Sequence, residues 1–250
     1  MTFNLPKKAN KLHLKCILGI ITVCMALSLI GLTYADEPIK VTISSTLHNV
    51  QFDGDWTFVS EWKHSSYDDL RFDDDRVLVL RTAHQDGFFY VMVNYLTDFT
   101  YNHIADRAIV CFDGYDTSSI ADETDWCYTI SRESGNGHTL RGGSPLYQTS
   151  HFNLVKNHPD FVAYGGTSDE SDRYVLTPHA AYEFRIPIEQ IGFQDEYGFF
   201  IQVSDGNDVK TYPKEFSGKF PQKIPSPAKW GKLISPDHSI SDWLKSISSK

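Results

Sequence analysis

Two cysteines, Cys111 and Cys127, enclose a segment with a cluster of acidic side chains. Five acids lie between them. Clustered carboxylates and loop carbonyls can supply the roughly six to eight oxygen ligands that Ca²⁺ takes. We therefore identify candidate calcium ligands at Asp113, Asp116 and Asp125. Their spacing is not that of an EF-hand, and a solvated acidic loop is the alternative interpretation.

The same two cysteines are candidates for a disulfide. They fall on adjacent predicted strands, and the leader described below places them outside the cytoplasm, where disulfides form and persist. A bond between Cys111 and Cys127 closes a loop of 17 residues. In the chain-entropy model such a loop contributes about 3 kcal/mol of stability. Two buried free thiols are the alternative.

Aromatic side chains form a second candidate set. A tryptophan ring can stack on the apolar face of a sugar ring, while nearby Asp, Asn and Arg side chains bind the hydroxyls. Trp56 and Trp62 are six residues apart on one predicted strand, Trp126 adjoins the acidic loop, and Tyr90 lies on another strand. These four are candidate ligand-binding residues, with ordinary core packing as the alternative.

No sequence motif for nucleophilic or zinc-dependent catalysis is present. HExxH, GxSxG and Gly-rich phosphate-loop patterns are absent. The nearest approach, at residues 142–145, has Pro145 after Ser144, and proline lacks the backbone N–H that an oxyanion hole would take from that position. We therefore expect no catalytic residues. A carboxylate pair for glycoside hydrolysis needs only proximity in space, so a glycan-acting enzyme stays an alternative.

The elements that must position these side chains are predicted to be short β-strands. Hydrophobic runs and alternating patterns recur between turn sequences. The predicted strands are residues 40–45, 56–62, 76–83, 88–95, 107–112, 126–131, 182–186, 197–204 and 209–212. Only short helices are expected, over 187–192 and 239–247. Proline begins the first of these and glycine follows it.

Two segments, 133–157 and 213–236, are predicted to be long loops. The second contains five prolines, and we expect it to lie as an extended strap over the sheets. The sequence therefore predicts an all-β fold, a single antiparallel β-sandwich of the jelly-roll or immunoglobulin-like type. We assign residues 36–238 to this domain and residues 239–250 to a short tail.

The first 35 residues are predicted to be a signal peptide that precedes the sandwich. Four lysines come before an apolar run of about 17 residues, and Thr33-Tyr34-Ala35 then suits cleavage by signal peptidase. An uncleaved membrane anchor is the alternative, although the run is shorter than the ~20 residues of a spanning helix. Either way, we expect an extracellular or cell-surface protein, in association with the cell surface or membrane if the anchor stays.

The leader also conceals how acidic the remaining chain is. The whole sequence has 23 Lys and Arg against 32 Asp and Glu, a formal net charge of −9. The leader holds four lysines and no acid, so residues 36–250 have 19 against 32, a net charge of −13. Nucleic acid is excluded as the main partner because phosphate binding requires a basic face.

Three stretches carry a resemblance to a known family. Residues 50–62, 80–98 and 105–113 read VQFDGDWTFVSEW, LRTAHQDGFFYVMVNYLTD and ADRAIVCFD. This pattern resembles the DOMON-like β-sandwich superfamily. That group includes family 9 carbohydrate-binding modules and the haem-b-binding domain of the ethylbenzene dehydrogenase gamma-subunit type. The resemblance covers about half of the chain after the leader.

The two branches of this superfamily imply different ligands. The carbohydrate-binding branch implies a Trp-lined sugar site with structural Ca²⁺. The haem branch implies a Met and a Lys as axial ligands. Met92 is the only methionine after the leader, which makes it the candidate haem ligand, and a gap-filling core methionine is its alternative role. No partner lysine is identified.

From these observations we predict a secreted, non-catalytic ligand-binding module. Its expected partner is a glycan or other small ligand, most specifically a carbohydrate, and its expected cofactor is structural calcium. The alternatives are a haem-b-binding electron-transfer domain and a glycan-acting enzyme.

Overall fold

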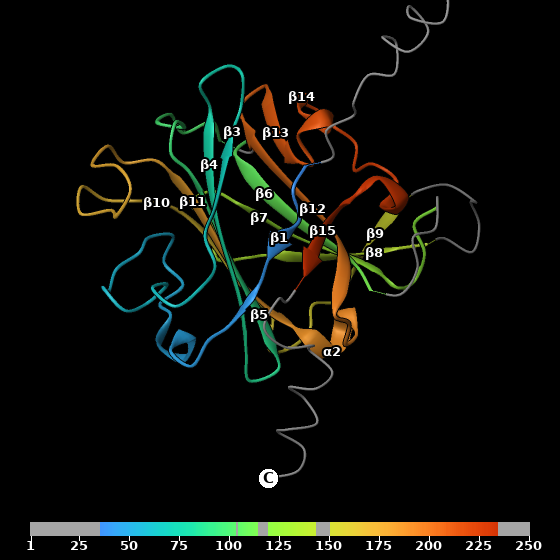
Figure 1. Ribbon diagram of the computed structural model, residues 1–250. Helices are drawn as coiled ribbons and strands as arrows, with labels where there is room; N and C mark the ends of the chain where they lie inside the picture. Colours follow the sequence, from blue (N-terminus) through green and yellow to red (C-terminus); the bar gives the residue numbers. More distant parts are fainter. Residues whose placement is uncertain (1–35, 104, 115–119, 144–150, 235–250) are drawn as a thin grey trace, which may run out of the picture. The chain divides into compact units, whose positions relative to one another are not determined.

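Two β-sheets packed face to face make up the structure, a computed structural model that describes residues 36–103, 105–114, 120–143 and 151–234 (Figure 1). This confirms the predicted all-β sandwich. No helix among these residues is long and apolar enough to cross a membrane. The predicted signal peptide at 1–35 and the predicted helix at 239–247 lie outside the described residues.

One sheet has nine strands. Its main path is, in spatial order, β1 (Ile39–Lys40), β15 (Gly231–Ile234), β12 (Glu196–Asp205), β6 (Arg107–Asp113), β7 (Asp125–Ser131), β8 (His138–Gly142) and β9 (Phe152–Val155). β13 (Asp208–Tyr212) continues along the edge of β12 that β15 leaves free, and β14 (Gly218–Lys219) pairs with β13.

The other sheet has six strands. Its path is β10 (Val162–Thr167), β11 (Ala180–Pro187), β5 (Phe88–Tyr95), β4 (Val77–Gln85) and β2 (Thr42–Ile43). β3 (Asp68–Arg71) pairs with the first half of β4. The strands β4 and β5 form a hairpin, and Gly87 in its turn has a φ of +84°.

Helical structure is limited to short pieces. The predicted helical turn near 187–192 is confirmed as α2 (Ile188–Ile191), which ends at Gly192 with a φ of +79°. The remaining pieces in the described part of the chain are 3-10 turns: η1 (Leu47–Asn49), η2 (Lys214–Phe216) and η3 (Pro227–Lys229).

The main hydrophobic core lies between the two sheets. Alternate side chains of neighbouring strands point into it, as the period of two in a β-strand requires. From the six-stranded sheet, β5 contributes Phe89, Val91 and Val93, all buried. From the nine-stranded sheet, Phe112 of β6 meets Phe89 with ring centroids 5.5 Å apart. This packing holds the two sheets together through apolar burial.

β4 is buried on both faces, as its continuous apolar sequence predicts. Leu78 and Leu80 face the main core, while Val79 and Ala83 on the opposite face are also buried. The opposite face is covered because residues 44–66 pass over it without joining the sheet; we call this stretch the covering segment. The second small core that it creates is described below.

The prediction of a strand over 56–62 is wrong. These residues form turns inside the covering segment, because side chains take the place of a partner strand as hydrogen-bond acceptors. The Glu61 carboxylate accepts backbone N–H bonds from Gln51 at 2.6 Å and Phe58 at 3.2 Å. Backbone donors satisfied in this way need no ladder.

The predicted strand 40–45 and the predicted loop 133–157 also need correction. The first is divided between the two sheets, with β1 parallel to β15 and β2 parallel to β4, so the sandwich has two parallel pairs in an otherwise antiparallel arrangement. The second contains β8 and β9, which extend the nine-stranded sheet beyond β7. Its short, mixed runs hide the alternation that marks a strand.

The predicted proline-rich strap is confirmed only over residues 220–230, because Gly218–Lys219 form β14 and Gly231–Ile234 form β15, which both pair within the nine-stranded sheet. Its anchor is Trp230, whose ring stacks on Phe200 at 6.2 Å and on Phe152 at 6.0 Å. The indole Nε1 donates to the carbonyl of Pro225 at 3.0 Å. The strap therefore covers the outer face of the nine-stranded sheet, as the covering segment does for the other sheet.

The half-buried side chain of Asp68 in β3, one of whose carboxylate oxygens is enclosed, predicts a pH dependence of stability. Burial raises the pKa of Asp68 to about 6, against the opposing charge of Lys40. The folded state then holds this proton more tightly than the unfolded chain does, so stability falls as pH rises from about 4 through 6. Asp68→Asn should raise the melting temperature at pH 8 and change it little at pH 4.

Thermal unfolding of both forms across this pH range measures the effect. Asp69→Asn removes the same charge from the next residue of β3 and is the matched control. An Asp68→Asn gain that is equal at pH 4 and pH 8 would contradict the assignment.

Candidate functional site

The paired strands β6 and β7 place Cys111 directly opposite Cys127, and the predicted disulfide is confirmed. Its sulfur atoms are 2.02 Å apart. Both cysteines are buried on the outer face of the nine-stranded sheet, where they pack with Phe200 and Trp230 of the strap region. The bond therefore ties two adjacent strands together beneath the strap.

Two of the three predicted calcium ligands lie side by side at the end of these strands. Asp113 and Asp125 are opposite each other in register and both are buried. One Asp125 oxygen accepts the backbone N–H of Asp122 at 2.7 Å. Asp116 lies outside the described residues. Calcium at this end of β6 and β7 stays a prediction.

Trp126 on β7 is half-buried. Its ring packs against the main core, and the Arg141 guanidinium lies over it at 4.9 Å from the centroid. Arg141 in turn donates to the carbonyl of Glu123 at 2.7 Å. Trp126 thus contacts the main core and the Arg141 side chain. It does not belong to the buried cluster that contains Trp56, Trp62 and Tyr90.

The remaining predicted residues come together beneath the covering segment. Trp56, Trp62, Tyr90 and Met92 belong to one buried cluster between that segment and the outer face of the six-stranded sheet. Trp62 is fully buried, and its ring meets Tyr90 edge-on at 6.5 Å. Trp62 and Tyr90 therefore pack as core residues and present no open ring to a sugar.

Met92 is only 1% exposed in this cluster. Its cross-strand neighbours are Arg81 of β4 and Glu183 of β11, and Trp62 and Tyr90 belong to the same buried cluster. A haem iron could reach the Met92 sulfur only if the covering segment left the sheet, so these residues do not fit a resident haem. The haem alternative stays a prediction that no described contact favours.

Glu183 of β11 holds the covering segment in place. Its wholly buried carboxylate accepts three hydrogen bonds: from the backbone N–H groups of Asp53 at 2.9 Å and Gly54 at 2.8 Å, and from Trp62 Nε1 at 3.1 Å. Burial raises the pKa of Glu183 well above its usual range. The covering segment passes so close to β10 at Gly54 that only glycine fits there, because a Cβ would lie 2.4 Å from the Gly166 Cα.

At the margin of the buried cluster, three aromatic rings surround one guanidinium. Arg81 of β4 lies 4.7 Å from the ring centroid of Trp56, 5.2 Å from that of Tyr67 and 5.8 Å from that of Tyr174. Tyr67 and Tyr174 stack at 6.2 Å, and Arg81 Nε donates to the Tyr174 hydroxyl at 2.5 Å. We call these four residues the aromatic–arginine cluster.

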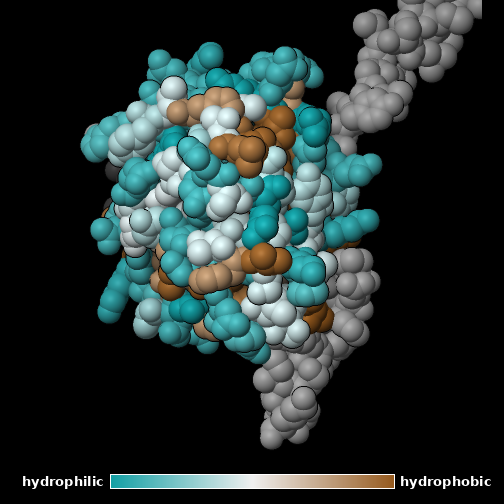
Figure 2. Space-filling view, turned by 90° about the vertical axis from the view of Figure 1, so that its left-hand side faces the viewer, coloured by the Kyte–Doolittle hydropathy of each residue, from teal (hydrophilic) through white to brown (hydrophobic). Residues whose placement is uncertain are grey.

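The aromatic–arginine cluster opens to solvent on one side. Tyr67 is 50% exposed, and the nearby Phe58 and Leu176 are exposed as well. The side of the molecule that lies on the left in Figure 1 faces the viewer in Figure 2, where hydrophilic residues predominate and hydrophobic ones form small separate patches. An exposed ring beside a fixed guanidinium combines an apolar platform with hydrogen-bond donors, as small-molecule sites do.

The loop that carries Tyr174 is fixed by three buried polar side chains. Ser168 Oγ lies 2.8 Å from His179 Nδ1, and Asp172 Oδ1 lies 4.0 Å from His179 Nε2. The set contains the residue types of a hydrolase triad. However, all three are buried, and the Ser168 oxygen already accepts the backbone N–H of His179 at 3.0 Å. Burial lowers the pKa of His179. The three side chains order the loop rather than expose a nucleophile.

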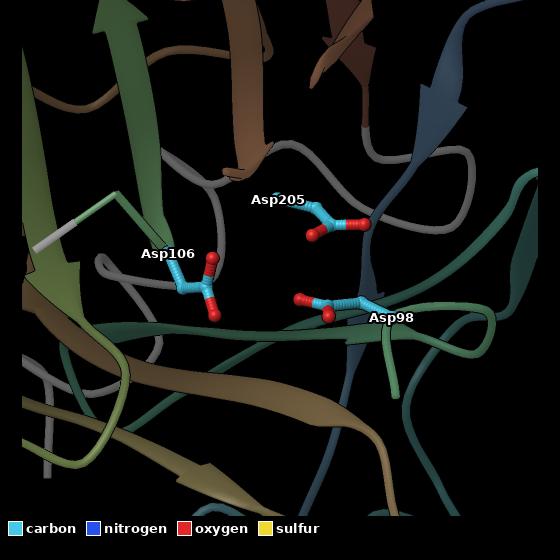
Figure 3. Close-up of side chains that lie close together, drawn as sticks. All are labelled: Asp98, Asp106 and Asp205. Carbon is cyan, nitrogen blue, oxygen red and sulfur yellow. The ribbon is translucent and has the colours of Figure 1, made fainter. Parts of the chain in front are cut away.

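A separate cluster of carboxylates lies at one end of the sandwich (Figure 3). Asp98 follows β5, Asp106 precedes β6, and Asp205 ends β12; one oxygen of each lies within 4.8 Å of the others. Sequence analysis did not single these residues out. The signal available was an acid at the end of each of three predicted strands, but only the sheet topology shows that those ends meet.

The electrostatics of this acidic cluster leave one negative charge uncompensated. Arg132 Nη1 lies 3.4 Å from Asp98 and 3.5 Å from Asp106, and Arg76 donates to Asp205 at 2.9 Å. The second Asp98 oxygen is buried without a hydrogen-bond partner. Burial, with the nearby charges of Asp205 and Asp106, raises the pKa of Asp98 to about 7. The site therefore favours a proton or a cation.

Comparison with known proteins identifies the fold. No family model and no curated protein matches the chain. Among solved structures, it is similar to a family 9 carbohydrate-binding module from Caldicellulosiruptor kristjanssonii in complex with cellotriose, with a TM-score of 0.51 and 13% identity over 81% of this chain and 95% of that one. A structure of such a module from the same organism with glucose has a TM-score of 0.49 and 14% identity, over 81% and 97%. The chain thus has a β-sandwich like that of family 9 modules.

The role of Glu183 can be tested by substitution. Glu183→Ala leaves three buried donors without an acceptor, and each such group costs roughly 1–3 kcal/mol. We expect the free energy of unfolding to fall by about 3 kcal/mol, with faster amide exchange across residues 44–66. Glu183→Gln keeps an acceptor oxygen and should lose less. Equal losses in the two variants, measured by denaturant unfolding, would contradict the anchoring role.

Proposed function

We propose that this protein is a carbohydrate-binding module that acts outside the cytoplasm, with the aromatic–arginine cluster as its sugar site. The observation that carries the proposal is the half-exposed Tyr67 ring fixed beside the Arg81 guanidinium. The fold supports it, because a similar sandwich from Caldicellulosiruptor kristjanssonii is described in complex with cellotriose. The predicted export signal agrees with a glycan partner at or beyond the cell surface.

Each part of the cluster has a role in this proposal. The Tyr67 ring supplies an apolar face for the C–H face of a sugar ring, and Arg81 supplies N–H donors for its oxygens. Trp56 and Tyr174 hold the guanidinium in one orientation by packing around it. A site that is ordered before binding loses less conformational entropy when a ligand arrives. The module binds and does no chemistry.

Sugar binding at Tyr67 can be measured by isothermal titration with cellotriose, glucose and a wider glycan panel. Loss of one stacking platform worth about 1.4 kcal/mol corresponds to a tenfold weaker affinity. We expect Tyr67→Ala to weaken binding by at least about that factor. Tyr101→Ala is the matched control, because Tyr101 is 49% exposed but lies by the acidic cluster.

Two outcomes would count against this proposal. One is the absence of binding to any glycan in the panel. The other is an equal loss of affinity in the Tyr67→Ala and Tyr101→Ala variants, which would show that sugar binding does not depend on the aromatic–arginine cluster.

We also propose that structural calcium binds at Asp98, Asp106 and Asp205. Hard Ca²⁺ takes carboxylate oxygens, and the unpartnered buried oxygen of Asp98 points to a missing positive partner. Arg132 and Arg76 neutralise two of the three charges, and a divalent cation would neutralise the third. When bound, the ion would tie the ends of β5, β6 and β12 together.

Thermal unfolding with calcium and with a chelator tests this site. At a calcium concentration about a hundredfold above its Kd, binding stabilises by about 2.7 kcal/mol, so the melting temperature should rise. Asp205→Asn should remove the rise, whereas Asp125→Asn, in the originally predicted site, should keep it. The reverse pattern would instead assign the calcium site to the end of β6 and β7. If calcium does not raise the melting temperature of the unaltered protein, the proposal of a calcium site is rejected.

A further inference from the structure

Within the described ranges of the chain, Arg81 lacks the carboxylate partner that Arg76 and Arg132 have. Arg76 pairs with Asp205 at 2.9 Å, and Arg132 pairs with Asp98 at 3.4 Å. In the described part of the chain, no carboxylate oxygen lies within 4.0 Å of Arg81. The chain after the leader has a net charge of −13. A shortage of acids therefore cannot explain this unpaired cation.

The hydrogen bonds of Arg81 leave part of its guanidinium available. Nε is satisfied by the Tyr174 hydroxyl. Nη1 makes only long contacts, to the carbonyls of Trp62 at 3.3 Å and Ser65 at 3.4 Å and to the Ser65 hydroxyl at 3.4 Å. Nη2 has no hydrogen-bond partner among the described residues. A guanidinium presents its donors as a planar fork that matches the two oxygens of a carboxylate or the oxygens of a sulfate.

The two flanking loops hold Asp55 and Asp172, whose hydrogen bonds go to backbone N–H groups, and the second Asp172 oxygen is buried without a hydrogen-bond partner. Asp55 accepts the backbone N–H groups of Trp56 at 2.7 Å and Asp169 at 3.2 Å. Asp172 accepts those of Tyr174 at 2.8 Å and Val175 at 3.1 Å. Their charge is directed at backbone donors of the two flanking loops. Arg81 therefore has aromatic neighbours in place of a counter-ion.

We propose that the aromatic–arginine cluster selects an acidic saccharide, one whose sugar ring carries a carboxylate or a sulfate. The anionic group binds the free edge of Arg81, and the sugar ring stacks on Tyr67. Partial enclosure by Trp56 and Tyr174 strengthens the charge-assisted hydrogen bonds by limiting access of water. This inference rests on the proposed function, and it narrows the ligand from glycans in general to those with an anionic group.

Matched ligands test the inference directly. Isothermal titration would compare cellotriose with the β-1,4-linked glucuronate trisaccharide, which differs in the oxidation state of C6, and with a 6-sulfated cellotriose. We expect at least one anionic ligand to bind about tenfold or more tightly than cellotriose, with affinity that falls as salt concentration rises. The comparison of the two anionic ligands identifies the group that is recognised.

Two arginine variants locate the effect. Arg81→Gln should abolish the preference for the anionic ligand. Arg185→Gln is the matched control, because Arg185 lies on the same face of the six-stranded sheet and also stacks on rings, those of Phe52 at 5.9 Å and Phe88 at 5.0 Å. Its loss removes the same charge, and the preference should remain. Circular dichroism and melting curves confirm that both variants are folded.

The outcomes separate this inference from the function on which it rests. Equal affinity for the neutral and both anionic ligands would overturn the acidic preference and leave carbohydrate binding intact. Equal losses in Arg81→Gln and Arg185→Gln would also overturn it, since net charge alone would then explain the preference. Failure of every ligand to bind would instead reject the proposed function.

Discussion

One buried carboxylate determines how the outer face of the six-stranded sheet is covered. Glu183 accepts two backbone N–H groups from the turn at 53–54 and the indole N–H of Trp62. A buried carboxylate is costly unless it is well hydrogen-bonded. The covering segment therefore has to keep the geometry that supplies these donors. The positions of Trp56 and Trp62 follow from that requirement.

The covering segment gives its two tryptophans different roles. Trp62 is drawn into the buried cluster with Tyr90 and Met92, where it completes a small core. Trp56, at the edge of the same cluster, packs against the Arg81 guanidinium beside the half-exposed Tyr67. Apolar burial and cation–π packing thus meet at one boundary. The buried cluster fixes Trp56, and Trp56 in turn packs against the Arg81 guanidinium beside Tyr67.

Acidic side chains gather where strands end. The carboxylates of Asp98, Asp106 and Asp205 converge where β5, β6 and β12 reach one end of the sandwich, and two arginines offset them in part. Asp113 and Asp125 converge at an end of β6 and β7, next to the disulfide. Acids placed at or just beyond the ends of strands leave the alternating core pattern intact, so these carboxylates do not interrupt the apolar interior.

Local sequence patterns predict the β-sandwich, most of its strands, the Cys111–Cys127 bond and part of the proline-rich strap. Those features depend on local alternation, on turn residues and on a pairing of neighbouring strands. Sequence analysis misplaced the 56–62 segment, because nothing local shows that the Trp62 indole donates to Glu183, 121 residues further along the chain. The tertiary structure was needed to show which aromatic rings are core, which ring stays open, and that Arg81 has no carboxylate partner among the described residues. Contacts between distant segments set burial, and burial decides whether an aromatic or charged side chain stabilises the fold or remains free to bind.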